Sequence, residues 1–338
     1  MEMAHKTYTR TIDNILSYYQ GLFYQTNKPL FPVPKIKKST IDEIGNIKEM
    51  LNRMHIKLQY NGSKINCHNF IGICEFTKKQ LFLLSVYVYP KHNMELLKST
   101  VSEIKIKESL NSVVIEKRTP HLPIQIIGYS TETNFLEEMP ENCVNCSIPG
   151  VKYLDDFIKE YHDDTYEKMA TILISELYDG TLLDFININY LKMSLDMWSI
   201  IIFQVIYTIY MTKTKLFNFV FGNLCPGKIK YQIIDPQKNS IIRVASKYGY
   251  LMRKHIFGIP NIGIRIKIVN FNKSFFAEKE QNHDVKYFLE SLGDLLINFY
   301  PHIPKEIISF IERNKNGSAF EILTTDSLFA KYRTNTIN

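Results

Sequence analysis

The stretch that decides the fold is LFNFVFGNLCPGKI, which spans Leu216–Ile229. It follows an apolar segment, Leu195–Lys213, that contains the only tryptophan of the chain. A long apolar segment broken only by single polar residues predicts a buried core helix. The Pro226-Gly227 pair favours a tight turn soon after it. The sequence therefore predicts a central helix that is followed by a structured loop.

Further motifs lie on either side of this loop. The central segment carries Trp198 near its start, followed by a Phe203-Gln204 pair. Downstream, Pro260–Gly263 reads PNIG and Ile264–Asn272 reads IRIKIVNFN, which predicts a strand that ends in a turn. Together these motifs resemble the kinase-like proteins of large DNA viruses. Those proteins carry a tryptophan-initiated helix, a His-x-Asp-Leu-x-Pro-Gly-Asn loop, a Pro-Asn-Ile-Gly insert and an Asp-Phe-Asp turn.

The resemblance covers Ile56–Tyr332 and implies an α+β, bilobal protein-kinase-like fold. An N-lobe of antiparallel sheet plus one helix is expected over residues 56–176, and a mainly helical C-lobe over residues 177–338. Residues 1–55 are expected to form an N-terminal helical extension. Three strand-like patterns and then a helical pattern support the N-lobe; they are Ile56–Tyr60, Phe70–Phe76, Gln80–Tyr89 and Val101–Lys117.

The residues at the catalytic positions of the C-lobe differ from those of a kinase. In a protein kinase, one loop aspartate orients the acceptor hydroxyl, a loop asparagine holds a metal ion, and the aspartate of a later turn holds another. The resemblance places Asn223, Lys228 and Asn270 at these three positions. Mg²⁺ prefers carboxylate ligands, and a lysine ammonium repels a cation. We therefore expect neither catalytic residues nor a metal site here.

The residues at the catalytic positions of the expected N-lobe also differ from those of a kinase. The resemblance places Ser85 where a kinase carries its phosphate-pairing lysine. It places Glu103 where a kinase carries the helix glutamate that pairs with this lysine, with Glu108 as the second choice. A serine can neither reach nor neutralise a phosphate. Only Gly62 and Gly72 stand in the region of the phosphate-covering loop, so an ordinary hairpin is expected there.

Two other sites are expected to keep a role. Glu176, Leu177 and Tyr178 resemble the hinge that recognises adenine in kinases through backbone groups. Backbone recognition survives a change of side chain, so ATP binding without a metal ion is a possible function of this segment. No cofactor is expected. Asp284 resembles the aspartate that braces the backbone of the catalytic loop, so the resemblance implies a structural role for it.

The composition sets outer limits on the class of protein. The 338 residues are 45% hydrophobic and 13% aromatic, which excludes a disordered chain. Lysine and arginine outnumber aspartate and glutamate by 41 to 34, and the net charge of +7 suits weak attraction to nucleic acid or to an acidic protein. Five cysteines argue against a disulfide framework and for a reducing compartment. The apolar run Trp198–Met211 is too short and too interrupted to predict a membrane span.

Two segments have no assigned role. The insert over residues 230–265 is long, and inserts of this length usually carry a function or a binding surface. Cys143 and Cys146 have the spacing of zinc ligands, but the sequence offers no second ligand pair at suitable spacing. A metal site is therefore not expected at these cysteines.

The favoured hypothesis is a catalytically inactive protein-kinase homologue, or pseudokinase, that binds or scaffolds a protein partner. By resemblance it would act in the virion or in the host cytoplasm. A second hypothesis is an atypical serine/threonine protein kinase that uses ATP, with Lys228 substituting for the lost strand lysine. A third is a basic structural component of the virion that contacts nucleic acid, although no motif of interleaved aromatic and basic residues supports it. Four simultaneous departures, at Ser85, Asn223, Lys228 and Asn270, favour the first hypothesis.

Overall fold

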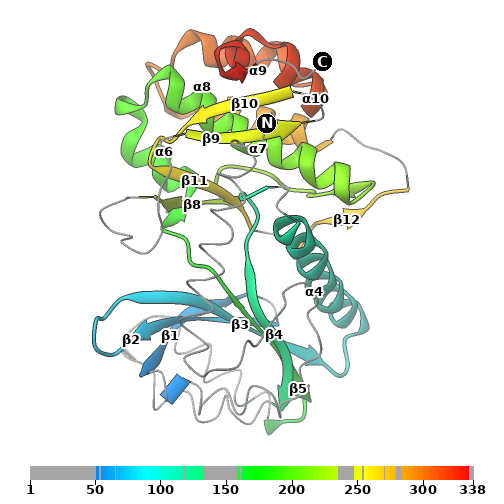
Figure 1. Ribbon diagram of the computed structural model, residues 1–338. Coiled ribbons are helices and arrows are strands. Elements are labelled where there is room, and N and C mark those ends of the chain that lie inside the picture. The colour runs from blue at the N-terminus through cyan, green and yellow to red at the C-terminus, as the bar shows by residue number, and fades with distance from the viewer. Residues whose placement is uncertain are drawn as a thin grey trace. The chain divides into compact units, whose positions relative to one another are not determined.

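The computed structural model describes most of the chain from residue 51 onward (Figure 1). The described residues are 51–52, 55–64, 66–116, 119–132, 159, 162–234, 247–252, 255–269, 271–278 and 283–334. Residues 1–50 of the expected N-terminal extension, Cys143, Cys146 and Asn270 lie outside them. The described residues divide into two compact units. We call residues 51–108 and 124–177 the sheet unit, and residues 109–123 and 178–334 the helical unit.

The sheet unit is built on a five-stranded antiparallel sheet with the strand order β1-β2-β3-β5-β4 (Figure 1). The central strand β3 reads QLFLLSVYVYP and is buried along most of its length, because apolar residues face both sides of the sheet. The elements of this unit are β1 (Ile56–Lys64), β2 (Cys67–Cys74), β3 (Gln80–Pro90), residues 94–108 of α4 (Met94–Ile115), β4 (Gln125–Glu132) and β5 (Tyr166–Ser175).

The helix α4 packs on this sheet. Its Ile104 forms a buried cluster with Cys67 of β2, Tyr87 of β3 and Leu173 of β5. Apolar contact of this kind between helix and sheet is the main stabilising interaction of such a layer.

The helix begins earlier than the sequence pattern predicted. It starts at Met94 rather than at Val101, because the side chain of Asn93 caps it. The Asn93 Oδ1 accepts a hydrogen bond from the backbone N–H of Leu96 at 3.0 Å. A cap of this kind satisfies an N–H group that would otherwise lack a partner at the helix start.

The segment Ser109–Pro123, which lies within the range 56–176 expected for the N-lobe, groups with the helical unit. Its His121 and Leu122 contact the strand β11 (Ile264–Ile268). The His121 carbonyl accepts from the N–H of Ile268 at 2.8 Å, and the Lys267 Nζ donates to the carbonyl of Leu122 at 3.1 Å. One of these bonds comes from the backbone of β11 and the other from a side chain of the same strand, and they explain why the segment belongs to this unit.

The helix α7 (Leu195–Lys215) forms the core of the helical unit. Ser194 caps its start by accepting from the Met197 N–H at 3.2 Å, and Gln204 in its middle accepts from the Ile266 N–H at 2.8 Å. By length and composition α7 could cross a membrane, but 78% of its most apolar window is buried inside the fold. It is therefore a core helix, as its interrupted apolar pattern indicated.

Around α7 lie the other helices and three small sheets (Figure 1). The helices and helical turns are α6 (Leu182–Asn189), η3 (Tyr190–Lys192), α8 (His283–Phe299), α9 (Lys305–Asn314), α10 (Ala319–Thr325) and η4 (Ser327–Tyr332). The strands besides β11 are β6 (Gly180–Thr181), β7 (Phe219–Val220), β8 (Ile229–Ile233), β9 (Lys247–Met252), β10 (His255–Pro260), β12 (Phe275–Phe276) and β13 (Arg333–Thr334).

The insert over residues 230–265 contributes an antiparallel hairpin of β9 and β10. The C-terminal strand β13 adds to this hairpin, with Arg333 opposite Phe257. The hairpin of the insert is thus tied to the end of the chain in one three-stranded sheet.

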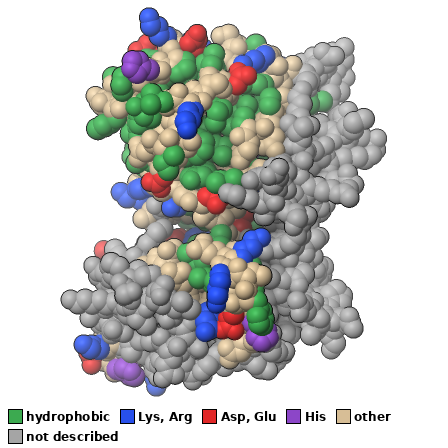
Figure 2. All heavy atoms as spheres, turned by 90° about the vertical axis from the view of Figure 1, so that its left-hand side faces the viewer, with side chains coloured by type: hydrophobic (Ala, Val, Ile, Leu, Met, Phe, Trp, Pro, Cys, Tyr) green, Lys and Arg blue, Asp and Glu red, His purple; other side chains and the backbone are tan. Residues whose placement is uncertain are grey.

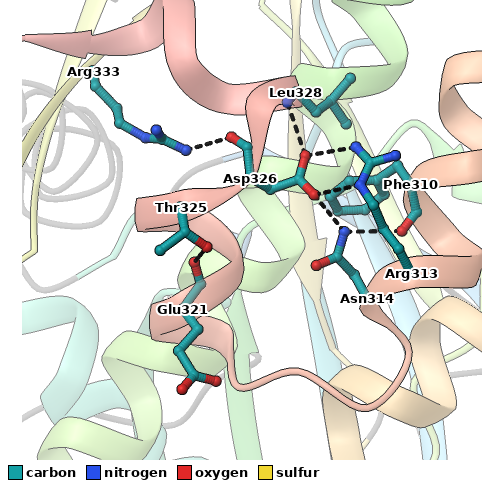
Figure 3. A network of polar contacts seen from close by, with 8 residues as sticks. All are labelled: Phe310, Arg313, Asn314, Glu321, Thr325, Asp326, Leu328 and Arg333. Carbon is teal, nitrogen blue, oxygen red and sulfur yellow. Dashed lines mark hydrogen bonds and ion pairs between the residues drawn. The ribbon is translucent and has the colours of Figure 1, made fainter.

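A polar network around Asp326 joins the last helices (Figure 3). Arg313 of α9 binds the carboxylate of Asp326 through two nitrogens, at 2.7 and 2.8 Å. Asn314 donates to the same carboxylate at 2.6 Å, and the N–H of Leu328 donates to it at 2.8 Å. Arg333 donates to the Asp326 carbonyl. The buried carboxylate of Asp326 thereby holds α9, the end of α10 and η4 together, and its backbone carbonyl binds the start of β13.

Candidate functional site

The loop between β7 and β8 carries the positions that resemble a catalytic loop. Phe221 at its start is fully buried, and Leu224 and Pro226 are buried further along. The carbonyl of Pro226 accepts from the N–H of Leu183 at 3.1 Å, which ties the loop to α6. Apolar anchors and this backbone bond fix the course of the loop.

Asp284, in the first turn of α8, holds the start of this loop. Its Oδ1 accepts hydrogen bonds from the backbone N–H of Phe221 at 3.0 Å and of Gly222 at 3.2 Å. Its Oδ2 is buried and has no hydrogen-bond partner among the described residues. Burial raises the pKa of the Asp284 carboxyl, although the two backbone hydrogen bonds and Lys213 act in the opposite direction.

Gly222 allows a second segment to approach the loop closely. Its φ of +75° lies in the left-handed region, and a Cβ at this position would lie 2.1 Å from the carbonyl oxygen of Lys273. Only glycine fits both conditions. The loop and the segment Phe271–Lys273 are therefore packed backbone against backbone.

The same two segments also share side-chain contacts. The ring of Phe221 lies 6.3 Å from the ring of Phe271, measured between centroids. The Ser274 Oγ donates to the carbonyl of Phe221 at 2.9 Å. The structure thus brings together the loop and the turn after β11, which the sequence motifs linked. Asn270 itself is outside the described residues.

Asn223 and Lys228 are both half-buried in this loop. Neither side chain makes a hydrogen bond or an ion pair with the residues that the structure describes. Asparagine cannot accept a proton as a general base, and a lysine ammonium does not ligate a metal ion. Across the described ranges, no three His, Cys, Asp or Glu side chains are grouped so that they could hold a metal ion.

In the sheet unit, Ser85 lies on β3 directly opposite Asn69 of β2. The Ser85 Oγ donates to the Asn69 Oδ1 at 2.8 Å. The position that resembles the phosphate-pairing lysine is thus occupied by a short, hydrogen-bonded side chain, and Ser85 makes no described contact with Glu103.

Glu103 has a cation beside it, but from its own helix. Lys107, one turn further along α4, lies 3.4 Å from the Glu103 Oε1. The hydroxyl of Tyr87 donates to the same oxygen at 3.0 Å and accepts from the Lys107 Nζ. Burial above all, and also the neighbouring Cys67 and Glu103, raise the pKa of Tyr87 well above its ordinary value, so the phenol stays protonated.

Sequence reasoning missed Tyr87, Lys107 and Asn69. One signal was present, because Glu103 and Lys107 have the i, i+4 spacing of a helical ion pair. The other two residues depend on which strand residues face the helix and on the register of β2 against β3, and neither follows from local pattern.

The turn between β1 and β2 is fastened to the rest of the sheet unit. Asn66 in this turn is buried and has a φ of +57°. Its Nδ2 donates to the Thr100 Oγ1 of α4 at 3.1 Å, and its carbonyl accepts from the N–H of Val88 at 3.0 Å. The two strands form a paired hairpin with a bulge between Tyr60 and Ser63.

The residues that resemble a hinge lie at the division between the two units. Glu176 is buried, and its Oε1 accepts from the N–H of Ile124 at 2.9 Å. Leu177 is the last residue of the sheet unit and Tyr178 the first of the second stretch of the helical unit. Both are half-buried.

Two features define the class of protein. One unit is an antiparallel sheet with a packed helix, and the other is mainly helical, with a loop that is held by an aspartate of a later helix. The chain has a protein-kinase-like fold. It is similar to a viral protein described as "Putative serine/threonine-protein kinase R400", from Acanthamoeba polyphaga mimivirus. The two chains are 28% identical, over 93% of this chain and 76% of the mimivirus protein. No protein-family model matches the chain.

Proposed function

We propose that this chain is a catalytically inactive protein-kinase homologue of a large DNA virus that acts as a binding or scaffolding protein. Its place of action would be the virion or the host cytoplasm. The observation that carries the proposal is the loop between β7 and β8. Its course is fixed by Asp284 and by the Phe271–Ser274 segment. By resemblance, Asn223 and Lys228 in this loop stand where a kinase has its base and a metal ligand.

The requirements of phosphoryl transfer explain why the residues of this loop matter. Catalysis of that reaction is mostly positioning and neutralisation of phosphate charge by metal ions. An ammonium in place of a ligand repels Mg²⁺, and an amide in place of the aspartate cannot orient and deprotonate a hydroxyl in the same way. Retained loop geometry without these groups favours a role that depends on shape and contact.

A surface of the helical unit supports a binding role. Figure 2 shows hydrophobic side chains gathered on one face of this unit, with few charged groups between them. Four large apolar side chains on α6, η3 and α8 are strongly exposed; they are Ile188 (73%), Leu191 (71%), Ile297 (65%) and Phe299 (71%). The ring contact of Tyr190 with Tyr300, at 4.9 Å, links η3 to the end of α8. Apolar exposure of this kind is more frequent at interaction surfaces than elsewhere.

A thermal-shift series tests the proposal. The melting temperature of the full chain is measured alone, with ATP and EDTA, with ATP and Mg²⁺, and with ATP and Mn²⁺. We expect the divalent ions to add no stabilisation beyond that of ATP alone, because ligand binding raises stability only where the ligand has a site. A metal-dependent rise in the melting temperature would contradict the proposal and favour the atypical kinase. A melting temperature that rises with DNA and falls back with salt would favour the nucleic-acid-binding component instead.

A further inference from the structure

The exposed apolar surface of the helical unit is held together by contacts between its elements. Four side chains from α6, η3 and α8 make up this surface, which we call the apolar patch: Ile188, Leu191, Ile297 and Phe299. The rings of Tyr190 and Tyr300 lie 4.9 Å apart, and the Tyr300 hydroxyl donates to the Asn187 Oδ1. These two contacts fix α6 and η3 beside the end of α8, so the patch is a preformed surface.

The charges around the apolar patch limit what can bind there. The exposed charged residues nearest to it in the chain are Lys192, which follows Leu191, and Asp294, which precedes Ile297 on α8. Because the two charges are opposite, they attract neither a strongly acidic nor a strongly basic partner. Figure 2 likewise shows few charged groups among the hydrophobic side chains of this face. The patch therefore suits an occupant that is apolar and has no net charge.

The same chain contains a segment of this kind, before the first described residue. Thr9–Leu22 reads TRTIDNILSYYQGL, in which one arginine and one aspartate cancel in charge. Its apolar residues follow the i, i+3, i+4, i+7 spacing of a single helical face; they are Ile12, Ile15, Leu16 and Tyr19. So short a helix is only marginally stable alone in water. It gains stability by placing its apolar face on an apolar surface.

We propose that Thr9–Leu22 forms an amphipathic helix that docks on the apolar patch of its own chain. Residues 23–50 join this segment to the sheet unit. A stretch of that length reaches up to roughly 90 Å when extended, so the connection does not prevent docking on the helical unit. The tether also holds the segment at an effective concentration on the order of millimolar, which favours it over a second copy of the chain.

Docking of the segment makes the apolar patch a regulated surface. A protein partner that uses the patch has to displace Thr9–Leu22 first, so the apparent affinity of the partner is lowered by the fraction of chains in which the segment is docked. This consequence rests on the proposed binding role. The docking itself does not, because it requires no partner and no property of the loop between β7 and β8.

Hydrogen exchange of the full chain tests the docking. The amides of Thr9–Leu22 are expected to exchange at least about tenfold more slowly in the wild type than in a free peptide of the same sequence. Leu191→Asp places a charge in the patch and should bring these rates within about twofold of those of the free peptide. The control is Phe217→Asp, at the opposite end of α7 from η3, which should leave the protection unchanged. Phe217 is 74% exposed and Leu191 is 71% exposed, so the two substitutions are matched.

A second pair of variants changes the segment and leaves the patch intact. Ile15→Asp falls on the apolar face of the expected helix, and Ser17→Asp falls on its polar face. A labelled peptide of residues 9–22 should bind the Ile15→Asp chain at least about tenfold more tightly than the wild type, in which the tethered segment competes with the peptide. The Ser17→Asp chain should bind the peptide as weakly as the wild type does.

Four results would overturn the proposal. One is exchange of Thr9–Leu22 in the wild type as fast as in the free peptide, and another is an equal loss of protection in Leu191→Asp and Phe217→Asp. The third is an Ile15→Asp chain that does not bind the peptide. The fourth is protection that appears only together with a dimer in analytical ultracentrifugation, because a second copy would then be the occupant. None of these results bears on the proposed inactivity, which is judged by phosphoryl transfer.

Discussion

Replacing Asp326 with alanine is expected to lower the free energy of unfolding by about 2–4 kcal/mol. The carboxylate is buried and accepts from Arg313, Asn314 and the N–H of Leu328. Alanine would leave the Leu328 N–H without a partner and would release α9 from the turn that follows α10. The larger loss of stability that follows when one partner of a fully buried ion pair is removed does not apply here. The Arg313 side chain is 43% exposed, so water can solvate it once Asp326 is gone. Urea unfolding monitored by circular dichroism measures the change.

The control for this variant is Asp294→Ala, at an exposed position of α8, which we expect to change stability by less than about 0.5 kcal/mol. Equal losses of stability in the two variants would show that the contacts of Asp326 do not stabilise the fold. Acid titration gives an independent check on the wild type. Burial alone would raise the pKa of Asp326, but the hydrogen bonds from Arg313 and Asn314 outweigh it and hold the pKa below its usual value.

The direction of the acid effect follows from that pKa. Because the folded-state pKa is depressed, the stabilisation is fully present above the unfolded-state pKa of about 4 and is lost as the pH falls through the folded-state value. Asp326→Asn should therefore flatten the loss of stability below about pH 4. An acid limb that is unchanged in this variant would show that Asp326 is not ionised in the network.

Replacing Asp284 with alanine is the second large expected effect. It removes the acceptor of two buried backbone donors, the N–H groups of Phe221 and Gly222, and should cost about 2–4 kcal/mol. Asparagine keeps an acceptor for both and removes a carboxylate whose pKa is raised by burial. A buried carboxyl with a raised pKa lowers the stability of the fold as the pH rises from the unfolded-state pKa through the folded-state value, because the unfolded chain ionises more readily. Asp284→Asn should therefore cost clearly less stability than Asp284→Ala at neutral pH.

Hydrogen exchange of the loop amides distinguishes a local effect from a global one. Asp284→Ala should speed the exchange of the Phe221 and Gly222 amides more than that of amides in the core of α7. If alanine and asparagine destabilise the chain equally, the hydrogen bonds to Oδ1 are not what holds the loop.

The sequence was most informative where a motif is local. The loop after α7, the turn after β11 and the aspartate at the start of α8 lie in short motifs, so their positions could be aligned without knowledge of the fold. The structure adds that the first two are packed together through Phe221, Phe271 and Gly222. A positive φ and a close backbone contact are three-dimensional requirements that the sequence shows only as a glycine.

Sequence reasoning was weakest where two elements meet. The pairing of Tyr87 with Glu103 depends on the placement of α4 against β3, and the bond between Asn69 and Ser85 depends on strand register. The start of α4 was missed because the cap at Asn93 follows a segment with a loop-like composition. The pairing of β13 with β10 joins residues far apart in the chain, and no local signal marks it.

The proposed function requires that a kinase-like fold has kept the course of its catalytic loop and lost the side chains that catalyse phosphoryl transfer. The most direct measurement is transfer of labelled γ-phosphate from ATP, with Mg²⁺ or Mn²⁺, onto the chain itself and onto a basic test protein. The wild type is compared with a variant that combines Asn223→Ala, Lys228→Met and Asn270→Ala. We predict that the wild type transfers no more phosphate than this variant does. Transfer by the wild type that disappears in the combined variant would contradict the account.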